Sequence, residues 1–104
     1  MAIKKLSIMH APGSKQGYIS ATRRQLESVF GAAHDWNGEH DKITTEWVLE
    51  IDKIRVTIYD YKNYNDDYKI VAPGMDEDFT WSIGSNNPLA VARVHKYATQ
   101  IVAL

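Results

Sequence analysis

The chain contains no cysteine, so it has no disulfide framework, no thiolate nucleophile and no cysteine-ligated zinc site. It also lacks long hydrophobic runs. The opening MAIKKLSIMHAPG has too short an apolar stretch for a signal peptide, and no later stretch is long enough to span a bilayer. The net charge of −1 provides no overall basic field for duplex nucleic acid. We therefore expect a cytoplasmic protein without membrane association, folded as one domain over residues 1–104.

Aromatic residues are the unusual part of the composition, with six tyrosines and three tryptophans in 104 residues. Tyrosine and tryptophan join an apolar ring to a polar group, which suits interfaces and stacking sites. Large rings also fill the cores of small domains. Composition alone leaves both interpretations open.

The first quarter of the chain predicts a strand, a loop and a helix. Residues 3–9 (IKKLSIM) are typical of a short strand, and residues 10–18 (HAPGSKQGY) of a loop. Thr22 is a predicted helix N-cap, and Gln25 three residues later completes a capping-box pattern. Gly31 is the expected end of this helix.

The middle of the chain predicts a hairpin. After a polar loop at residues 34–41, residues 43–51 (ITTEWVLEI) alternate as a half-buried strand does. We expect the face with Trp47 to point to the core, and the face with Thr44, Glu46, Val48 and Glu50 to be the more exposed one. Residues 54–62 (IRVTIYDYK) begin a second strand. The two-residue link Asp52-Lys53 predicts a hairpin turn, although lysine disfavours positive φ.

The last third predicts a long loop, a strand and a helix. Residues 63–78 are long and polar, and such loops are often functional. Residues 79–84 (FTWSIG) predict a strand, and Asn87 with Pro88 predicts a helix start. The spacing within that helix predicts a face toward the sheet (Val91, Val94, Ala98, Ile101) and a face toward solvent (Arg93, Lys96, Gln100).

These elements predict an α+β fold in the order β-α-β-β-β-α. We expect a two-layer sandwich, with a mainly antiparallel sheet and two helices packed on one of its faces.

Most catalytic and metal patterns are missing. The four histidines (His10, His34, His40, His95) lack the spacing of zinc ligands, and the acidic run at 76–78 lacks that of a calcium loop. A metal site in the loop at 34–41 and a carboxylate pair such as Glu46 and Glu50 stay open from the sequence. We expect a binding protein without cofactor or metal, and not an enzyme.

Two glycine-containing loops precede the predicted helices, at residues 11–22 and 83–88. Helix N-termini present free N–H groups and partial positive charge, so each is a candidate anion site. Lys15, Arg23 and Arg24 can reach an anion at the first loop. Glycine and asparagine also occur as ordinary punctuation before helices.

The segment TIYDYKNYNDDYK (57–69) concentrates tyrosine. Alternation predicts that Tyr59 and Tyr61 share one strand face, while Tyr64 and Tyr68 continue into the loop. Tyrosine rings near a sheet edge can stack on bases, but tyrosine is also a favoured strand residue.

The order of short motifs also carries a resemblance: Gly17-Tyr18, Phe30-Gly31, Asp41-Lys42, Glu46-Trp47, Thr57 to Lys62, Trp81 and Ile83-Gly84. Over residues 17–103 it resembles a family of small uncharacterised proteins encoded by phages and phage-like elements. The chain departs from the pattern at Asp52-Lys53, where Asp-Gly is expected, and at Ser85, where glycine is expected. The resemblance implies a small phage protein acting in the host cytoplasm, and no particular activity.

Two hypotheses follow, because small phage proteins often act by sequestering a ligand or blocking a host protein. The first is an anti-defence protein that sequesters a nucleotide-like ligand without turnover, as a homo-oligomer that closes the site. Its candidate ligand-binding residues are Tyr18, Arg23, Arg24, Tyr61, Lys62, Trp81, Gly84, Ser85, Asn86 and Arg93. The second is an inhibitor that binds a host protein through the tyrosine-rich acidic loop 63–78.

Overall fold

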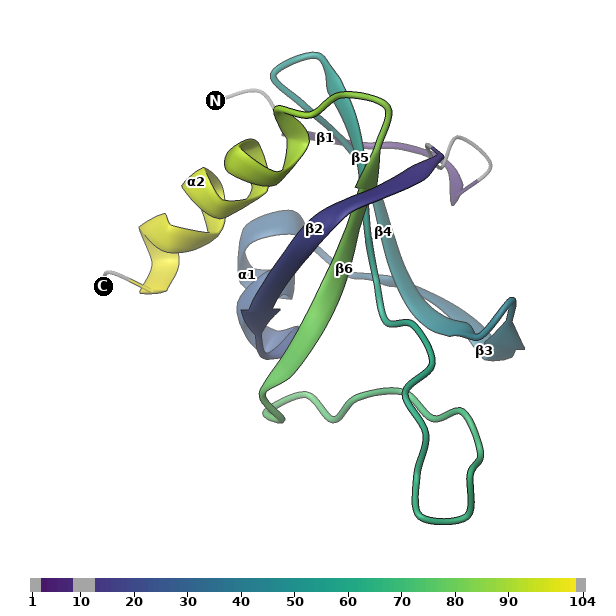
Figure 1. Ribbon diagram of the computed structural model, residues 1–104. Coiled ribbons are helices and arrows are strands. Elements are labelled where there is room, and N and C mark those ends of the chain that lie inside the picture. The colour runs from purple at the N-terminus through teal and green to yellow at the C-terminus, as the bar shows by residue number, and fades with distance from the viewer. Residues whose placement is uncertain (1–2, 9–12, 103–104) are drawn as a thin grey trace.

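A computed structural model describes residues 3–8 and 13–102. Over these residues the elements are β1 (Ile3–Lys5), β2 (Ser14–Ala21), α1 (Arg23–Phe30), β3 (His34–His40), β4 (Ile43–Ile51), β5 (Ile54–Tyr59), β6 (Phe79–Ser85) and α2 (Ala90–Val102) (Figure 1). The strands form one antiparallel sheet, and both helices lie on the same side of it (Figure 1). The predicted α+β fold is therefore confirmed.

The sheet follows the order β1-β4-β5-β6-β2, and β3 also pairs with β4. The two pairings on β4 do not overlap, because β1 pairs with the end near Ile51 and β3 with the end near Ile43. No helix of the described part of the chain is long and apolar enough to cross a membrane.

Two strands lie where we predicted loops. Residues 14–18 are part of β2, which pairs with β6 through a bulge between Lys15 and Gly17. Most of the predicted polar loop at residues 34–41 forms β3, in which Asn37 and Gly38 have positive φ. Both strands contain exposed polar side chains, so neither shows the apolar alternation that reveals a strand. Within residues 3–8, β1 is shorter than predicted, and Met9 lies outside the described residues.

The predicted helix ends are largely confirmed. The Gln25 N–H donates to Thr22 Oγ1 at 3.1 Å and the Thr22 N–H donates to Gln25 Oε1 at 2.9 Å, which completes the capping box. Gly31, at φ 85°, ends α1. Helix α2 begins at Ala90, two residues after Pro88. Asn87 Oδ1 accepts the Leu89 N–H at 2.8 Å, which is the contact expected of an N-cap, and the Asn87 carbonyl accepts the Ala90 N–H at 3.1 Å.

The core lies between the helices and the inner face of the sheet. Trp47 and Ile58 are direct partners on β4 and β5, and both are fully buried. Trp47 also meets Trp81 edge-to-face, with ring centroids 5.3 Å apart. The core includes Ile19, Leu26, Phe30, Leu49, Ile51, Val56, Ile83, Val94 and Ala98. Val94 and Ala98 confirm the predicted inner face of α2; the side chains of Gln100 and Ile101 lie outside the described set.

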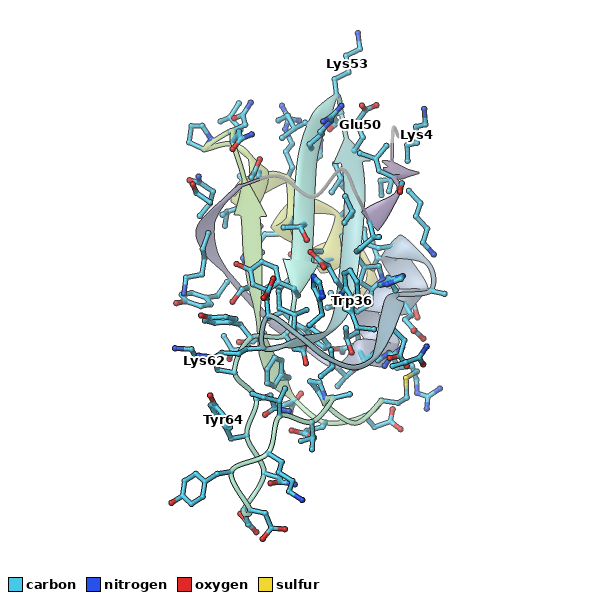
Figure 2. All side chains as sticks on the ribbon, turned by 90° about the vertical axis from the view of Figure 1, so that its right-hand side faces the viewer. Lys4, Trp36, Glu50, Lys53, Lys62 and Tyr64 are labelled. Atoms are coloured by element: carbon cyan, nitrogen blue, oxygen red, sulfur yellow. The ribbon has the colours of Figure 1, made fainter. Side chains whose placement is uncertain are left out.

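Strand β4 is buried on both faces, which corrects the expected half-buried strand. Thr44, Glu46 and Val48 were expected to lie on its more exposed face, and all three are buried. Side chains cover this face. Trp36 of β3 lies across it and donates to Glu46 Oε1 at 3.3 Å, and Thr44 Oγ1 donates to the buried Asp60 at 2.6 Å (Figure 2).

The two loops at the ends of β5 behave differently. Asp52 and Lys53 both adopt positive φ, 50° and 70°, so the predicted hairpin turn forms despite the lysine. Loop 63–78 contains no named strand, as predicted, but Tyr64 and Ile70 pair across it. Figure 1 shows this loop projecting beyond the end of the sheet.

Candidate functional site

The outer face of the sheet, opposite the helices, brings together side chains from β2 and β5. Tyr18 and Tyr59 both lie opposite Ser82 of β6, so their side chains leave the same face on either side of a small residue. Neighbouring strands lie about 4.8 Å apart, which separates β2 from β5 by about 10 Å. The sheet register therefore makes a shallow trough with tyrosines on both sides.

The floor of this trough at Gly84 is restricted to glycine. Lys15 and Thr57 lie opposite it, and a Cβ added at Gly84 would approach Thr57 Cγ2 to 2.8 Å. The same Cβ would lie 3.5 Å from Tyr59 Cε1, so the Tyr59 ring leans over the glycine. Gly84 thus serves the close approach of neighbouring side chains, not a loop around an anion.

An ammonium group lies among the tyrosines. Lys15 Nζ is 4.9 Å from the centre of the Tyr18 ring. Hydrogen bonding to the Tyr18 side chain raises the pKa of Lys15 above its ordinary value. The lysine is exposed, so its charge is available to a ligand.

The surface continues past the end of β5. Tyr59 and Tyr61 meet edge-to-face at 6.4 Å, and Lys62 Nζ is 5.2 Å from the centre of the Tyr61 ring. Tyr18 is 51% exposed and Tyr61 43% exposed, so both rings can be contacted from solvent. We call Lys15, Tyr18, Tyr59, Tyr61 and Lys62 the tyrosine face.

The phenol of Tyr59 is held in its neutral form. Burial raises the pKa of Tyr59, while the nearby Lys15 charge partly opposes the rise. A neutral phenol carries a hydroxyl proton that it can donate to a phosphate or a base edge. The tyrosine face therefore offers rings for stacking, ammonium groups and a hydroxyl donor together.

Asp60 fixes the chain where it leaves β5. Its carboxylate is fully buried and accepts hydrogen bonds from the Thr44 N–H, the Thr45 N–H and Thr44 Oγ1, at 2.8, 2.8 and 2.6 Å. Two residues later the Lys62 N–H donates to the Lys42 carbonyl at 3.0 Å. Asp60 thereby positions Tyr61 and Lys62. In sequence it is one aspartate between two tyrosines, and nothing in that pattern reveals its buried partners.

Beside the tyrosine face, strand β3 covers a buried carboxylate. Glu46 Oε2 accepts from Thr57 Oγ1 at 2.7 Å, and Glu46 Oε1 accepts from Trp36 Nε1 at 3.3 Å. Figure 2 shows Trp36 lying across the outer face of the sheet. The Trp36 ring stacks on His40 at 3.9 Å and meets His34 edge-on at 4.6 Å.

The geometry supports neither the metal site in residues 34–41 nor the catalytic carboxylate pair, the two possibilities that the sequence left open. Among the side chains that the structure describes, no group of three or more His, Cys, Asp or Glu could hold a metal ion. Glu46 and Glu50 share a strand face, but Glu46 is held by Thr57 and Trp36 beneath β3.

The candidate anion site before α2 was expected to combine Gly84, Ser85 and Asn86 with Trp81 and Arg93, and we call these five the cradle residues. Their side chains do not come together around one open site, which corrects the expected roles of Trp81 and Arg93. Trp81 is fully buried, with its Nε1 donating to the Ala21 carbonyl at 3.0 Å, so it cannot stack on a ligand. Ser85 is fully buried and donates to the Arg55 carbonyl at 2.6 Å. Arg93 pairs with Asp52 at 3.1 Å. Of the cradle residues, Asn86 alone is exposed.

The two arginines at the start of α1 also lie apart from the tyrosine face. Arg23 pairs with Glu27 at 3.2 Å, and Arg24 makes two hydrogen bonds to Asp76, at 2.7 and 3.2 Å. The hydrogen bond from Arg24 lowers the pKa of Asp76. Both guanidinium groups are thus engaged by carboxylates. Of the ten predicted site residues, the structure gathers Tyr18, Tyr61 and Lys62, with Gly84 in the floor beneath them.

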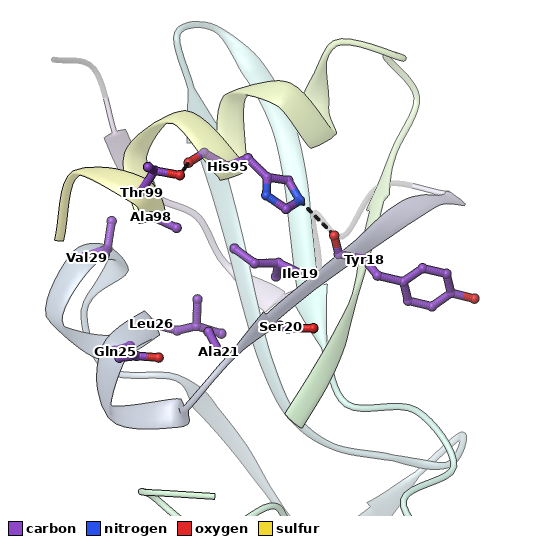
Figure 3. A pocket seen from close by; sticks show the side chains of 10 residues that line it. All are labelled: Tyr18, Ile19, Ser20, Ala21, Gln25, Leu26, Val29, His95, Ala98 and Thr99. Atoms are coloured by element: carbon purple, nitrogen blue, oxygen red, sulfur yellow. Dashed lines mark hydrogen bonds between the residues drawn. The ribbon is translucent and has the colours of Figure 1, made fainter. Parts of the chain in front are cut away.

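A separate cavity of about 380 Å³ lies on the helix side of β2 (Figure 3). It is lined mainly by Ile19, Ala21, Leu26, Val29 and Ala98. His95 Nε2 lies 2.8 Å from the Tyr18 carbonyl oxygen, whereas the Tyr18 ring points away from this cavity (Figure 3). The cavity and the tyrosine face are therefore on opposite sides of the same strand.

Comparison with known proteins adds no relative to this picture. No protein-family model, no curated protein and no solved structure matches the chain. The resemblance to small phage-encoded proteins accordingly stays a prediction, and the functional argument depends on the geometry of the site.

Proposed function

We propose that this protein captures a nucleotide-like ligand on the tyrosine face and holds it without turnover. The observation that supports this most is Lys15, whose ammonium lies 4.9 Å from the centre of the exposed Tyr18 ring. Lys15 also lies opposite Gly84, over which the Tyr59 ring leans. A base can stack on an exposed tyrosine ring, and such a contact contributes about 1–3 kcal/mol. Lys15 and Lys62 then supply the charges that phosphate requires.

Capture without chemistry fits the state of the nearest carboxylates. Glu46 is engaged by Thr57 and Trp36, and Asp60 accepts three hydrogen bonds in full burial. Neither is free to take a proton from a bound ligand. In the setting that the phage resemblance suggests, holding a signalling nucleotide would withdraw it from a host defence response.

Calorimetric titration of cyclic and linear nucleotides tests this proposal. We expect Tyr18→Ala to weaken binding by about five- to 150-fold, the equivalent of one stacking contact. Tyr68→Ala is the matched control, because Tyr68 is an exposed tyrosine at the far end of loop 63–78. Chromatography of the released ligand should recover it unchanged. If no nucleotide binds the wild type, or if both variants bind equally well, the proposal fails.

A second candidate function is inhibition of a host protein through loop 63–78. The Val71 N–H donates to the Asn63 carbonyl and the Asn65 N–H to the Lys69 carbonyl, both at 2.9 Å, so the loop is a preorganised hairpin. It presents Tyr68, which is 86% exposed, near its tip. An exposed aromatic side chain on a loop held by backbone hydrogen bonds is a common anchor in protein interfaces.

The same control variant separates the two functions. Binding of a host protein that is lost in Tyr68→Ala, without nucleotide binding by the wild type, favours the inhibitor. Nucleotide binding that survives Tyr68→Ala favours capture. The expected homo-oligomer remains a prediction of either scheme, and a monomeric mass in light scattering would contradict it.

A further inference from the structure

We infer that the ligand of the tyrosine face is a single-stranded oligonucleotide of about three nucleotides, and this rests on the proposed nucleotide capture. The first reason is the extent of the surface. From Tyr18 on β2 to Lys62 beyond β5 it spans about 14 Å, from two strand spacings across the sheet and three residues along it. One base covers one ring, so a mononucleotide would leave most of this surface empty.

The second reason is the arrangement of rings and charges. Lys15 lies at Tyr18 on β2, and Lys62 lies at Tyr61 at the other end of the surface. The backbone of Lys42 lies next to that of Lys62, since the Lys42 carbonyl accepts the Lys62 N–H at 3.0 Å. Ammonium groups therefore occur at both ends of a line of rings, as a chain of alternating bases and phosphates requires. Sheet surfaces that bind single strands stack two or three bases in this way.

The third reason excludes a duplex as the favoured ligand. Paired bases keep their faces stacked on each other, so tyrosine rings can stack only on bases that are splayed out. The net charge of −1 supplies no broad positive field for a duplex backbone. Binding should therefore come from stacking, with a limited contribution from about three lysines.

Competition measured by fluorescence anisotropy tests the inference. The probe is a fluorescein-labelled octathymidylate, and the unlabelled competitors are dTMP, dithymidylate, tetrathymidylate, tetrauridylate and a 12-base-pair duplex. We expect the affinity to rise at least tenfold from dTMP to tetrathymidylate and to change little beyond it. The two tetranucleotides decide between DNA and RNA as the source. The logarithm of the binding constant should fall with the logarithm of salt concentration with a slope of about −2, as three single-strand phosphate contacts predict.

Two pairs of variants place the contact on the tyrosine face. We expect Tyr61→Leu to weaken tetrathymidylate binding at least fivefold, while the exposed control Tyr68→Leu leaves it unchanged. Lys62→Met should reduce the salt slope by about 0.7, while Lys4→Met, the same charge change on β1, should not. All four side chains are exposed, so each variant is expected to fold, and circular dichroism is the check.

The outcomes separate this inference from the proposed function. If dTMP competes within tenfold of tetrathymidylate, the oligonucleotide inference is overturned while nucleotide capture stands. A duplex that competes as well as the single strand also overturns it. If neither mononucleotides nor oligonucleotides bind the wild type, both proposals fail together.

Discussion

The two faces of the sheet use the same strands for different purposes. On the inner face Trp47 and Trp81 are fully buried, and each indole N–H donates to a backbone carbonyl, of Gly31 and Ala21 respectively. On the outer face Tyr18 and Tyr61 keep large parts of their rings in solvent. Aromatic residues whose polar atoms are satisfied internally stabilise the fold, whereas those left open can bind.

Strand β6 shows how four consecutive residues produce this contrast. In the segment Trp81-Ser82-Ile83-Gly84 the side chains of Trp81 and Ile83 point to the core, whereas the outer face has only the small Ser82 side chain and the bare backbone of Gly84. The large inward residues fill the space below the helices. The small outward residues leave room for Tyr18 and Tyr59 on either side. Replacing residues on one face should therefore change stability, and on the other mainly binding.

The largest effect is expected at the inner face. Trp47→Ala should lower the free energy of unfolding by about 3–5 kcal/mol, because it empties a fully buried site beside Ile58 and Trp81. Trp36→Ala on the outer face is the matched control and should cost less than half as much. Urea denaturation of both variants measures the difference. An unchanged midpoint for Trp47→Ala would contradict the assignment of this face to the core.

The second-largest loss of stability is expected at Asp60, the buried carboxylate that follows β5. Asp60→Asn should cost about 2–4 kcal/mol, because hydrogen bonds to a buried charged group contribute more than neutral ones and the amide cannot accept all three. Asp66→Asn, on the exposed loop, is the control. Both are measured by denaturation at neutral pH. Equal stability of the two variants would show that the Asp60 network contributes nothing.

The buried contact between Glu46 and Thr57 stabilises the fold although it lies on the outer face, beneath β3. Glu46→Leu should cost about 1–3 kcal/mol, because it leaves the Thr57 hydroxyl and the Trp36 N–H without their acceptor. Adding Thr57→Val to Glu46→Leu should restore part of the loss. A double-mutant cycle measures this coupling, and strictly additive effects would refute it.

Sequence reasoning succeeded where local patterns decide the structure. The capping box at Thr22 and Gln25, the strand at 43–51 and the core position of Trp47 depend on spacing alone. It missed β2 and β3, because their polar residues are held in strands by partners distant in sequence. It also assigned Trp81 and Arg93 to the site, because their partners Ala21 and Asp52 are distant in sequence and no local pattern reveals them. Only the sheet register shows that Lys15 joins Tyr18 and Tyr59, which are 41 residues apart in the chain.

Arg93 tests whether the helix start takes any part in binding. Arg93→Ala should cost at most about 1 kcal/mol of stability, because its ion pair with Asp52 is partly exposed. It should leave nucleotide affinity unchanged, in contrast to Tyr18→Ala. Calorimetric titration compares the two. A tenfold loss of affinity in Arg93→Ala alone would move the site back to the N-terminus of α2.

The smallest expected effect is the alkaline titration of Tyr59, which is also the most direct test of the geometry around Lys15. Because burial raises the pKa of Tyr59 above its ordinary value of 10.0, the folded state retains this proton when the unfolded state has lost it. The contribution to stability is therefore fully present below pH 10 and is lost as the pH rises through the raised pKa. Tyr59→Phe should remove this part of the alkaline loss.

Absorbance of tyrosinate near 295 nm follows the same group directly, as the difference between the wild type and Tyr59→Phe. Lys15→Met should raise the pKa of Tyr59 further, since it removes the positive charge that opposes the effect of burial. Lys4→Met, an equal loss of charge on β1, should leave the pKa where it is. If both lysine variants shift the titration equally, Lys15 has no special place among the tyrosines. The outer face would then be a set of separate exposed rings and not a site.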